Sequence, residues 1–277
     1  MTELFQDPFL QSTFLPALAA LTAALVLRPF GAAAAGLGFV IGFLVSVVFV
    51  AGWQWQPLTS TRKIVLLGGV AAVLGLLCDW AGAWRPRVLA VLALLAGCGA
   101  LWVGWRILAR LDGWDRVLAA TAVVAYTAWL AVGVAPLRDR PGVGVSALLA
   151  LALGTSVSAV LGASALLGQL AGAAAAASGA LLLVLMLFPG DRFGYAFYYS
   201  AGLLSGLIGV AAVLVASVPW YALIPLAFVP ALARLPVPAA TTRRELLRQL
   251  LVINIYVLPP VMVAIGLLFY LRGAPAV

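Results

Sequence analysis

The stretch Val143–Phe188 runs for 46 residues without a charged side chain. A helix needs about twenty apolar residues to cross the hydrocarbon core of a bilayer, so this stretch is too long for one crossing and fits two. Gly162, Gly168 and Gln169 offer a turn between them. Lipid admits only helices or closed barrels, and the unbroken Ala, Leu and Val runs lack the alternation of a barrel. The sequence therefore predicts an all-α, polytopic transmembrane helical bundle.

Similar apolar runs recur along the whole chain and predict about ten spans. The polar connections between them are too short to bury a core of their own, so we expect a single membrane-embedded domain, 1–277. The short ninth run carries Pro225 and Pro230, and re-entry without crossing is its alternative. The predicted spans are Phe9–Leu27, Ala32–Gly52, Ile64–Trp80, Val88–Trp105, Val117–Leu137, Val143–Leu161, Leu166–Phe188, Tyr195–Ser217, Trp220–Leu235 and Leu246–Leu271.

Composition agrees with a lipid environment. Hydrophobic residues make up 65% of the chain and charged residues 9%, against roughly a quarter charged in a soluble domain. The sixteen basic residues are scattered singly, so no basic surface for nucleic acid is expected. All but Lys63 are arginine, and together with abundant Ala and Gly this indicates a GC-rich bacterial genome. The acidic start, with Glu3 and Asp7, does not fit a signal peptide. We expect a multi-pass protein of the bacterial inner (cytoplasmic) membrane.

Orientation follows from the basic residues that flank the predicted spans. Ten fall on one side and six on the other, and the positive-inside rule assigns the larger group to the cytoplasm, which leaves both termini outside. The larger group is Arg28, Arg85, Arg87, Arg138, Arg140, Arg192, Arg234, Arg243, Arg244 and Arg248, and the smaller is Arg62, Lys63, Arg106, Arg110, Arg116 and Arg272.

Several chemistries are excluded. The chain has no histidine, which removes haem b, most transition-metal sites and the usual general base. Cys78 and Cys98 are predicted at different depths, too far apart for a disulfide. The string Asp112–Arg116 shares an Asp-Gly pair with the metal-binding motif of membrane phosphotransferases that act on CDP-linked alcohols. That motif needs further aspartates one and two turns later, and Val117–Leu137 has none. We expect no enzyme, no cofactor and no metal.

Candidate residues of a substrate or ion pathway are few. Asp79 is the acid nearest to a span interior, with Arg85 or Arg87 as its expected ion-pair partner and a proton or cation site as the alternative. Hydroxyls gather in mid-span at Thr155, Ser156 and Ser158, where packing competes with a neutral-solute pathway.

The last predicted span contains Pro259 and Pro260. Proline lacks an N–H, so the carbonyl groups four residues earlier lose their helical partners and a kink is expected. Asn254 and Tyr256 stand close in sequence and complete a candidate polar site, while a fixed kink without a function is the alternative.

Glycines four residues apart create flat helix faces that admit a neighbouring helix. We expect these faces to pack within the monomer, with a homo-oligomer interface as the alternative. The pairs are Gly38 with Gly42, Gly168 with Gly172, and Gly202 with Gly206.

Two functional classes remain. The leading hypothesis is a permease or channel-like carrier of a small solute, since compact carriers of the drug/metabolite type share this size and span count. The alternative is a non-catalytic accessory or scaffold subunit of a larger membrane complex, whose partners would be other membrane proteins.

Overall fold

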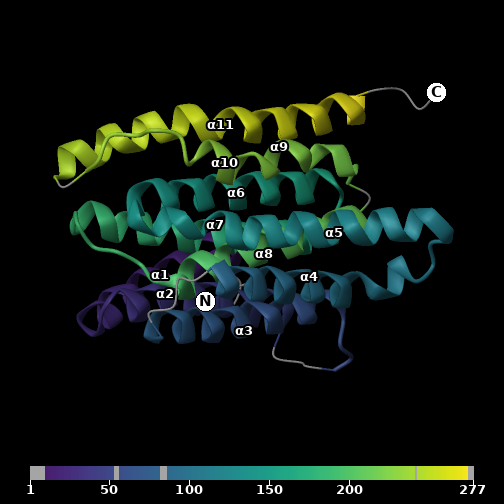
Figure 1. Ribbon diagram of the computed structural model, residues 1–277, viewed down its shortest axis with the longest axis horizontal. Coiled ribbons are helices and arrows are strands. Elements are labelled where there is room, and N and C mark those ends of the chain that lie inside the picture. The colour runs from purple at the N-terminus through teal and green to yellow at the C-terminus, as the bar shows by residue number, and fades with distance from the viewer. Residues whose placement is uncertain (1–9, 53–55, 82–85, 217, 241, 274–277) are drawn as a thin grey trace.

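A computed structural model describes residues 10–52, 56–81, 86–216, 218–240 and 242–273. Within these ranges the chain is a bundle of roughly parallel and antiparallel helices, with α11 along one edge and α3 along the other (Figure 1). The elements are η2 (Leu10–Phe14), α1 (Leu15–Leu27), η3 (Arg28–Phe30), α2 (Ala32–Ala51), α3 (Ser60–Trp80), α4 (Pro86–Leu108), α5 (Gly113–Gly133), η4 (Ala135–Asp139), α6 (Pro141–Leu161), α7 (Ala165–Leu187), α8 (Tyr195–Val215), η5 (Trp220–Ala222), α9 (Ile224–Ala227), α10 (Val229–Leu232) and α11 (Arg243–Gly273).

The predicted fold class is confirmed. In the described ranges nine helices are long and apolar enough to span a membrane, and the uncharged stretch divides into α6 and α7 at Gly162–Ser164. The main differences lie at span starts: α3 begins at Ser60 and α5 at Gly113, each four residues before the predicted boundary. Charged residues interrupt the apolar runs at those starts, so the predicted spans began about one helical turn too late.

The ninth predicted span is a chain of short helices, η5, α9 and α10. It starts beside the far end of α6, because Val218 lies against Gly162. It ends at the opposite end of the bundle, where Arg140 donates to the carbonyl oxygen of Leu235 at 3.5 Å. The segment therefore runs from one end of the bundle to the other and does not re-enter. Together with the nine long helices it makes ten passes along the bundle in the described chain, so the start of η2 and the end of α11 lie at the same end.

Helix α8 forms the centre of the bundle. In the most apolar 18-residue segment of α8, 83% is buried inside the protein, the largest share among the nine long helices of the described ranges. It contacts α2, α3, α4, α5, α6 and α7. Every residue from Tyr195 to Ala212 is buried, so neighbouring helices enclose α8 on all sides.

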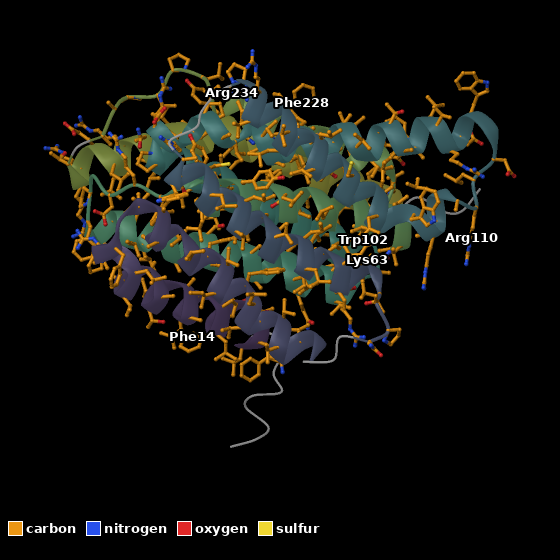
Figure 2. All side chains as sticks on the ribbon, turned by 60° about the horizontal axis from the view of Figure 1, so that its bottom comes forward. Phe14, Lys63, Trp102, Arg110, Phe228 and Arg234 are labelled. Carbon is orange, nitrogen blue, oxygen red and sulfur yellow. The ribbon has the colours of Figure 1, made fainter. Side chains whose placement is uncertain are left out.

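Charged and aromatic side chains gather at the two ends. Arg28, Arg138, Arg140 and Arg234 lie at the end where α8 begins, which we call the arginine-rich end. At the opposite end Lys63 lies beside Trp102, with its Nζ 5.1 Å from the ring centroid (Figure 2). Exposed tryptophans also sit at helix ends, where an indole ring suits the headgroup region: Trp80, Trp105, Trp114 and Trp220 are 65–89% exposed. Cytoplasmic placement of the arginine-rich end stays a prediction.

Pro259 and Pro260 do not end the last helix, and the kink expected at them stays a prediction. Helix α11 is a continuous helix from Arg243 to Gly273 with Pro259 and Pro260 inside it. Neither proline can donate to the carbonyl four residues earlier, but α11 lies on the edge of the bundle, where loss of two hydrogen bonds does not divide it. Pro259 faces outward and Pro260 is buried.

Each predicted glycine pair lies on a helix surface that meets a neighbour within the chain. A Cβ at Gly38 would lie 2.8 Å from the carbonyl oxygen of Ala20 in α1, and one at Gly42 would lie 2.5 Å from that of Pro16. Such distances leave no room for a side chain, so α1 and α2 are in backbone contact. Gly168 and Gly172 of α7 face α6, with Val160 and Ser156 as their neighbours. Gly202 and Gly206 lie at the α5–α8 contact, which is described below.

Candidate functional site

The contact between α5 and α8 is built on glycine. A Cβ at Gly202 would lie 2.5 Å from the carbonyl oxygen of Leu130, and one at Gly206 would lie 3.1 Å from the Cα of Thr127. One turn further, a Cβ at Gly209 would meet the ring and hydroxyl of Tyr126 at 3.3 Å. The small residues let the two antiparallel helices approach closely and bring α5 side chains against the middle of α8.

Three buried hydroxyl groups of these two helices have no hydrogen-bond partner among the described residues. They belong to Tyr126 and Thr127 of α5 and to Ser205 of α8, and we call them the α5–α8 cluster. Thr127 is 0% exposed and Ser205 2%. Ser205 is the eleventh residue of α8, about 15 Å along the helix and so near the middle of a hydrocarbon core of about 30 Å.

Further buried hydroxyls in the described ranges also lack a partner. They lie on α6 and on the first half of α8: Ser146, Ser158, Tyr198 and Ser200. Other hydroxyls are bound within the protein, because Ser178 donates to the carbonyl oxygen of Ala174 at 2.9 Å and Tyr199 donates to that of Leu92 at 2.9 Å. The buried hydroxyls without a partner thus differ from Ser178 and Tyr199, because their hydrogen-bonding capacity is not used by the described residues.

Asp79 holds the first turn of α8. Its carboxylate accepts the backbone N–H of Tyr195 at 2.7 Å and faces Arg138 at 3.5 Å. The guanidinium of Arg138 also lies over the Tyr195 ring, 4.3 Å from its centroid. A carboxylate at a helix N-terminus satisfies free N–H groups and suits the helix dipole. Asp79 therefore ties α3, η4 and α8 together at the arginine-rich end.

Among the described residues, the ion-pair partner of Asp79 is Arg138. The sequence pointed to Arg85 or Arg87, which follow Asp79 along the chain, and Arg85 lies outside the described residues. Helix η4, 59 residues later, packs against α8 and brings Arg138 to Asp79.

A second ion pair closes the same end of the bundle. The Nε of Arg28 donates to the Asp191 carboxylate at 2.5 Å, and its guanidinium lies 3.8 Å from the centroid of Phe188. This pair joins the end of α1 to the loop between α7 and α8. At the opposite end Lys63 and Arg116 donate to backbone carbonyl groups. Ion pairs between helix ends thus occur at the arginine-rich end in the described chain.

A cavity of about 190 Å³ opens at the arginine-rich end between α6, α7 and α11. Asp139, Arg140 and Gln249 contribute its polar groups, and the Gln249 amide donates to the carbonyl oxygen of Pro238 at 2.7 Å. Ligand sites usually enclose about 300–1,000 Å³. This cavity is smaller and its buried amide nitrogen is engaged, so we do not place the main site here.

The structure spreads the hydroxyls predicted on α6 over three environments. Thr155 donates to the carbonyl oxygen of Leu151 at 2.8 Å, within its own helix. Ser156 donates to the carbonyl oxygen of Gly168 at 2.7 Å and joins α6 to α7. Ser158 is buried and has no partner among the described groups. Asp79 is at the other end of the bundle, so these residues do not form one site.

The polar residues predicted on α11 are also dispersed. The Asn254 amide donates to the carbonyl oxygen of Leu250 at 2.8 Å, one turn back in the same helix. Tyr256 is half-buried, and Pro259 points outward. The amide nitrogen of Asn254 is engaged within its own helix, and a polar site shared with Tyr256, Pro259 and Pro260 stays a prediction.

Sequence reasoning missed the α5–α8 cluster and Arg138. The sequence of α8 could have pointed to the cluster, because Ser200 and Ser205 are the two serines of an otherwise apolar, glycine-containing span. Total burial makes polar residues in such a span significant. Thr127 gave no comparable signal, because an isolated threonine in an apolar helix usually bonds to its own backbone.

Together the apolar helices, their buried centre and the charged ends define a multi-pass integral membrane protein, in contact with the lipid bilayer. A scan against protein-family models and a search of curated proteins each gave no match to this chain. Its function must therefore be argued from the geometry.

Proposed function

We propose that this protein is a permease for a small solute without net charge, and that the α5–α8 cluster contacts the solute. The observation that supports this most strongly is the set of three buried, unpaired hydroxyls of Tyr126, Thr127 and Ser205 at mid-depth. A buried polar group without a partner costs about 1–3 kcal/mol. A cluster of them in one place is accounted for when they serve as donors and acceptors for a polar molecule that passes through.

The charge distribution supports an uncharged solute. The acids of the described chain lie at helix ends or in connections: Asp79, Asp112, Asp115, Asp139, Asp191 and Glu245. A charged solute at mid-depth would need a nearby counter-charge, because burial of an unpaired ion is very costly. Hydroxyl groups suit polyols, amides and similar neutral molecules. The proposal assigns transport and not catalysis to the chain.

The ion pairs Arg28–Asp191 and Arg138–Asp79 fit a carrier closed at the arginine-rich end. Each joins elements distant in sequence, and both lie where α8 begins. In alternating access one end of the pathway is sealed while the other is open. Opening toward this end would require both pairs to separate.

The test is transport by purified protein in liposomes. Stopped-flow light scattering with glycerol and urea, and uptake of a labelled larger polyol, would report permeability. We expect a solute-specific rate above that of empty liposomes, and its loss in the double variant Thr127→Val, Ser205→Ala. The matched control is Thr155→Val, because the Thr155 hydroxyl is already bound to Leu151. Full activity of the double variant would remove the cluster from the pathway.

A second candidate, an accessory subunit of a membrane complex, is favoured by one feature. The outer surface of α2 and α3 carries an apolar groove of about 440 Å³, lined by Leu44, Val70 and Leu74 among others. An apolar groove on a membrane protein suits a helix of a partner as well as lipid. Purification in mild detergent distinguishes the candidates, since a stoichiometric partner protein supports the subunit and an isolated chain supports the permease.

A further inference from the structure

Tyr198 of α8 is a fully buried tyrosine whose hydroxyl has no hydrogen-bond partner among the described residues. It stands seven residues before Ser205 of the α5–α8 cluster, which is two helical turns less about 20°. The two side chains therefore leave α8 on the same side, about 10 Å apart along the helix. We propose that the Tyr198 hydroxyl is a second binding group for the solute, between the cluster and the arginine-rich end; this assignment rests on the permease function proposed above.

Helices α5 and η4 together cover this side of α8. Helix η4 begins two residues after α5 ends, and both contact α8. At the cluster the covering residue is Thr127 of α5, which lies against Gly206. Near Tyr198 it is Leu137 of η4, because the Tyr198 ring and Leu137 both lie against Gly144 of α6. Tyr198 and the cluster therefore lie along one interface, between α8 and the segment formed by α5 and η4.

The described structure closes this interface on both sides of Tyr198. One turn before it, the guanidinium of Arg138 lies 4.3 Å from the ring centroid of Tyr195 and takes part in the ion pair described above. One turn after it, α8 touches α5, because a Cβ at Gly202 would lie 2.5 Å from the carbonyl oxygen of Leu130. A polar group enclosed between two closures is placed to hold a solute in transit, as alternating access requires.

Packing does not account for the Tyr198 hydroxyl. The neighbouring rings are phenylalanines: the centroid of Phe197 lies 4.9 Å from that of Tyr198, and Phe193 lies 5.8 Å from Phe197. A phenylalanine at position 198 would fill the same space without a buried, unpaired O–H, which is costly. The next residue, Tyr199, shows the ordinary arrangement, since its hydroxyl donates to the carbonyl oxygen of Leu92 at 2.9 Å. A small polyol or amide would pair with the Tyr198 hydroxyl and place its carbon atoms against the rings.

The test compares Tyr198→Phe with Tyr199→Phe in the liposome assay described above. Tyr198→Phe removes one oxygen and keeps the ring, so the solute-specific permeability should fall by about two- to tenfold, as expected for one lost hydrogen bond to the solute. Its melting temperature should equal or exceed that of wild type, because no described hydrogen bond is lost. Tyr199→Phe is the matched control. It should melt at a lower temperature and keep its permeability, because its hydroxyl is bound to Leu92.

The outcomes separate the role of Tyr198 from the permease function. Wild-type permeability equal to that of empty liposomes would remove the function and the role of Tyr198 with it. Transport by wild type that is unchanged in Tyr198→Phe would overturn the role of Tyr198 alone. A lower melting temperature of Tyr198→Phe would also overturn it, because the hydroxyl would then be bonded within the protein. Reduced transport at full stability, with normal transport by Tyr199→Phe, supports the second binding group.

Discussion

Substituting Gly202 with alanine is the sharpest stability test of the α5–α8 contact. The new Cβ would lie 2.5 Å from the carbonyl oxygen of Leu130, well inside the about 3.5 Å at which carbon atoms make favourable contact. The obstacle is backbone, so relief requires α5 or α8 to move. Overpacking of this kind costs about 1–3 kcal/mol, and alanine regains about 1 kcal/mol over glycine in helix propensity. We expect a net loss of up to about 2 kcal/mol.

The matched control is Gly266→Ala in α11, where a Cβ would meet nothing within 4 Å. Only the propensity gain applies there, so the free energy of unfolding should stay constant or rise by up to about 1 kcal/mol. Reversible unfolding in mixed micelles with increasing dodecyl sulfate, followed by tryptophan fluorescence, measures both. If Gly202→Ala is as stable as Gly266→Ala, α5 and α8 are not in backbone contact and the geometry of the cluster is wrong.

Three further predictions follow from the described contacts. Asp79→Ala should lower the free energy of unfolding by about 1–2 kcal/mol, because α8 loses its N-terminal cap. Asp79→Asn should lower it by less, because an amide oxygen can still accept the first N–H of α8. Equal losses in the same unfolding assay would mean that the ion pair with Arg138 matters more than the cap. Cys98 is exposed near the middle of α4 and should face lipid, so a membrane-impermeant maleimide should leave it unlabelled when the other cysteine is serine, and rapid labelling would place water there. A reporter active only in the cytoplasm should be silent when fused to Val277, and a bright signal would reverse the orientation.

The sequence predicts the architecture well because hydrophobic length is a local property. Each long span can be recognised from about twenty residues without knowledge of its neighbours. Errors arose where charges enter a helix end, as at Ser60 and Gly113. Pro259 and Pro260 remove two hydrogen bonds from α11 but do not end it.

The candidate site was harder to predict because it depends on contacts between distant segments. Whether a hydroxyl is free follows from its surroundings: Thr155 bonds within its helix, whereas Thr127 does not. Among the described residues, Asp79 likewise pairs with Arg138 of η4, which lies far from it along the chain. A single sequence carries no measure of such distances, so the α6 and α11 residues were grouped by proximity along the chain.

The central claim, that a solute pathway passes the α5–α8 cluster, is tested most directly by cysteine accessibility at Ser205. In a chain with both native cysteines replaced by serine, Ser205→Cys is treated in membranes with a small water-soluble thiosulfonate reagent. The chain with only Cys98 retained is the control at similar depth on the lipid-facing side of α4. We predict that Ser205→Cys reacts steadily while Cys98 does not, because opening of the carrier admits water to mid-depth. If Ser205→Cys stays as unreactive as Cys98, the cluster is sealed from water and the permease account is contradicted.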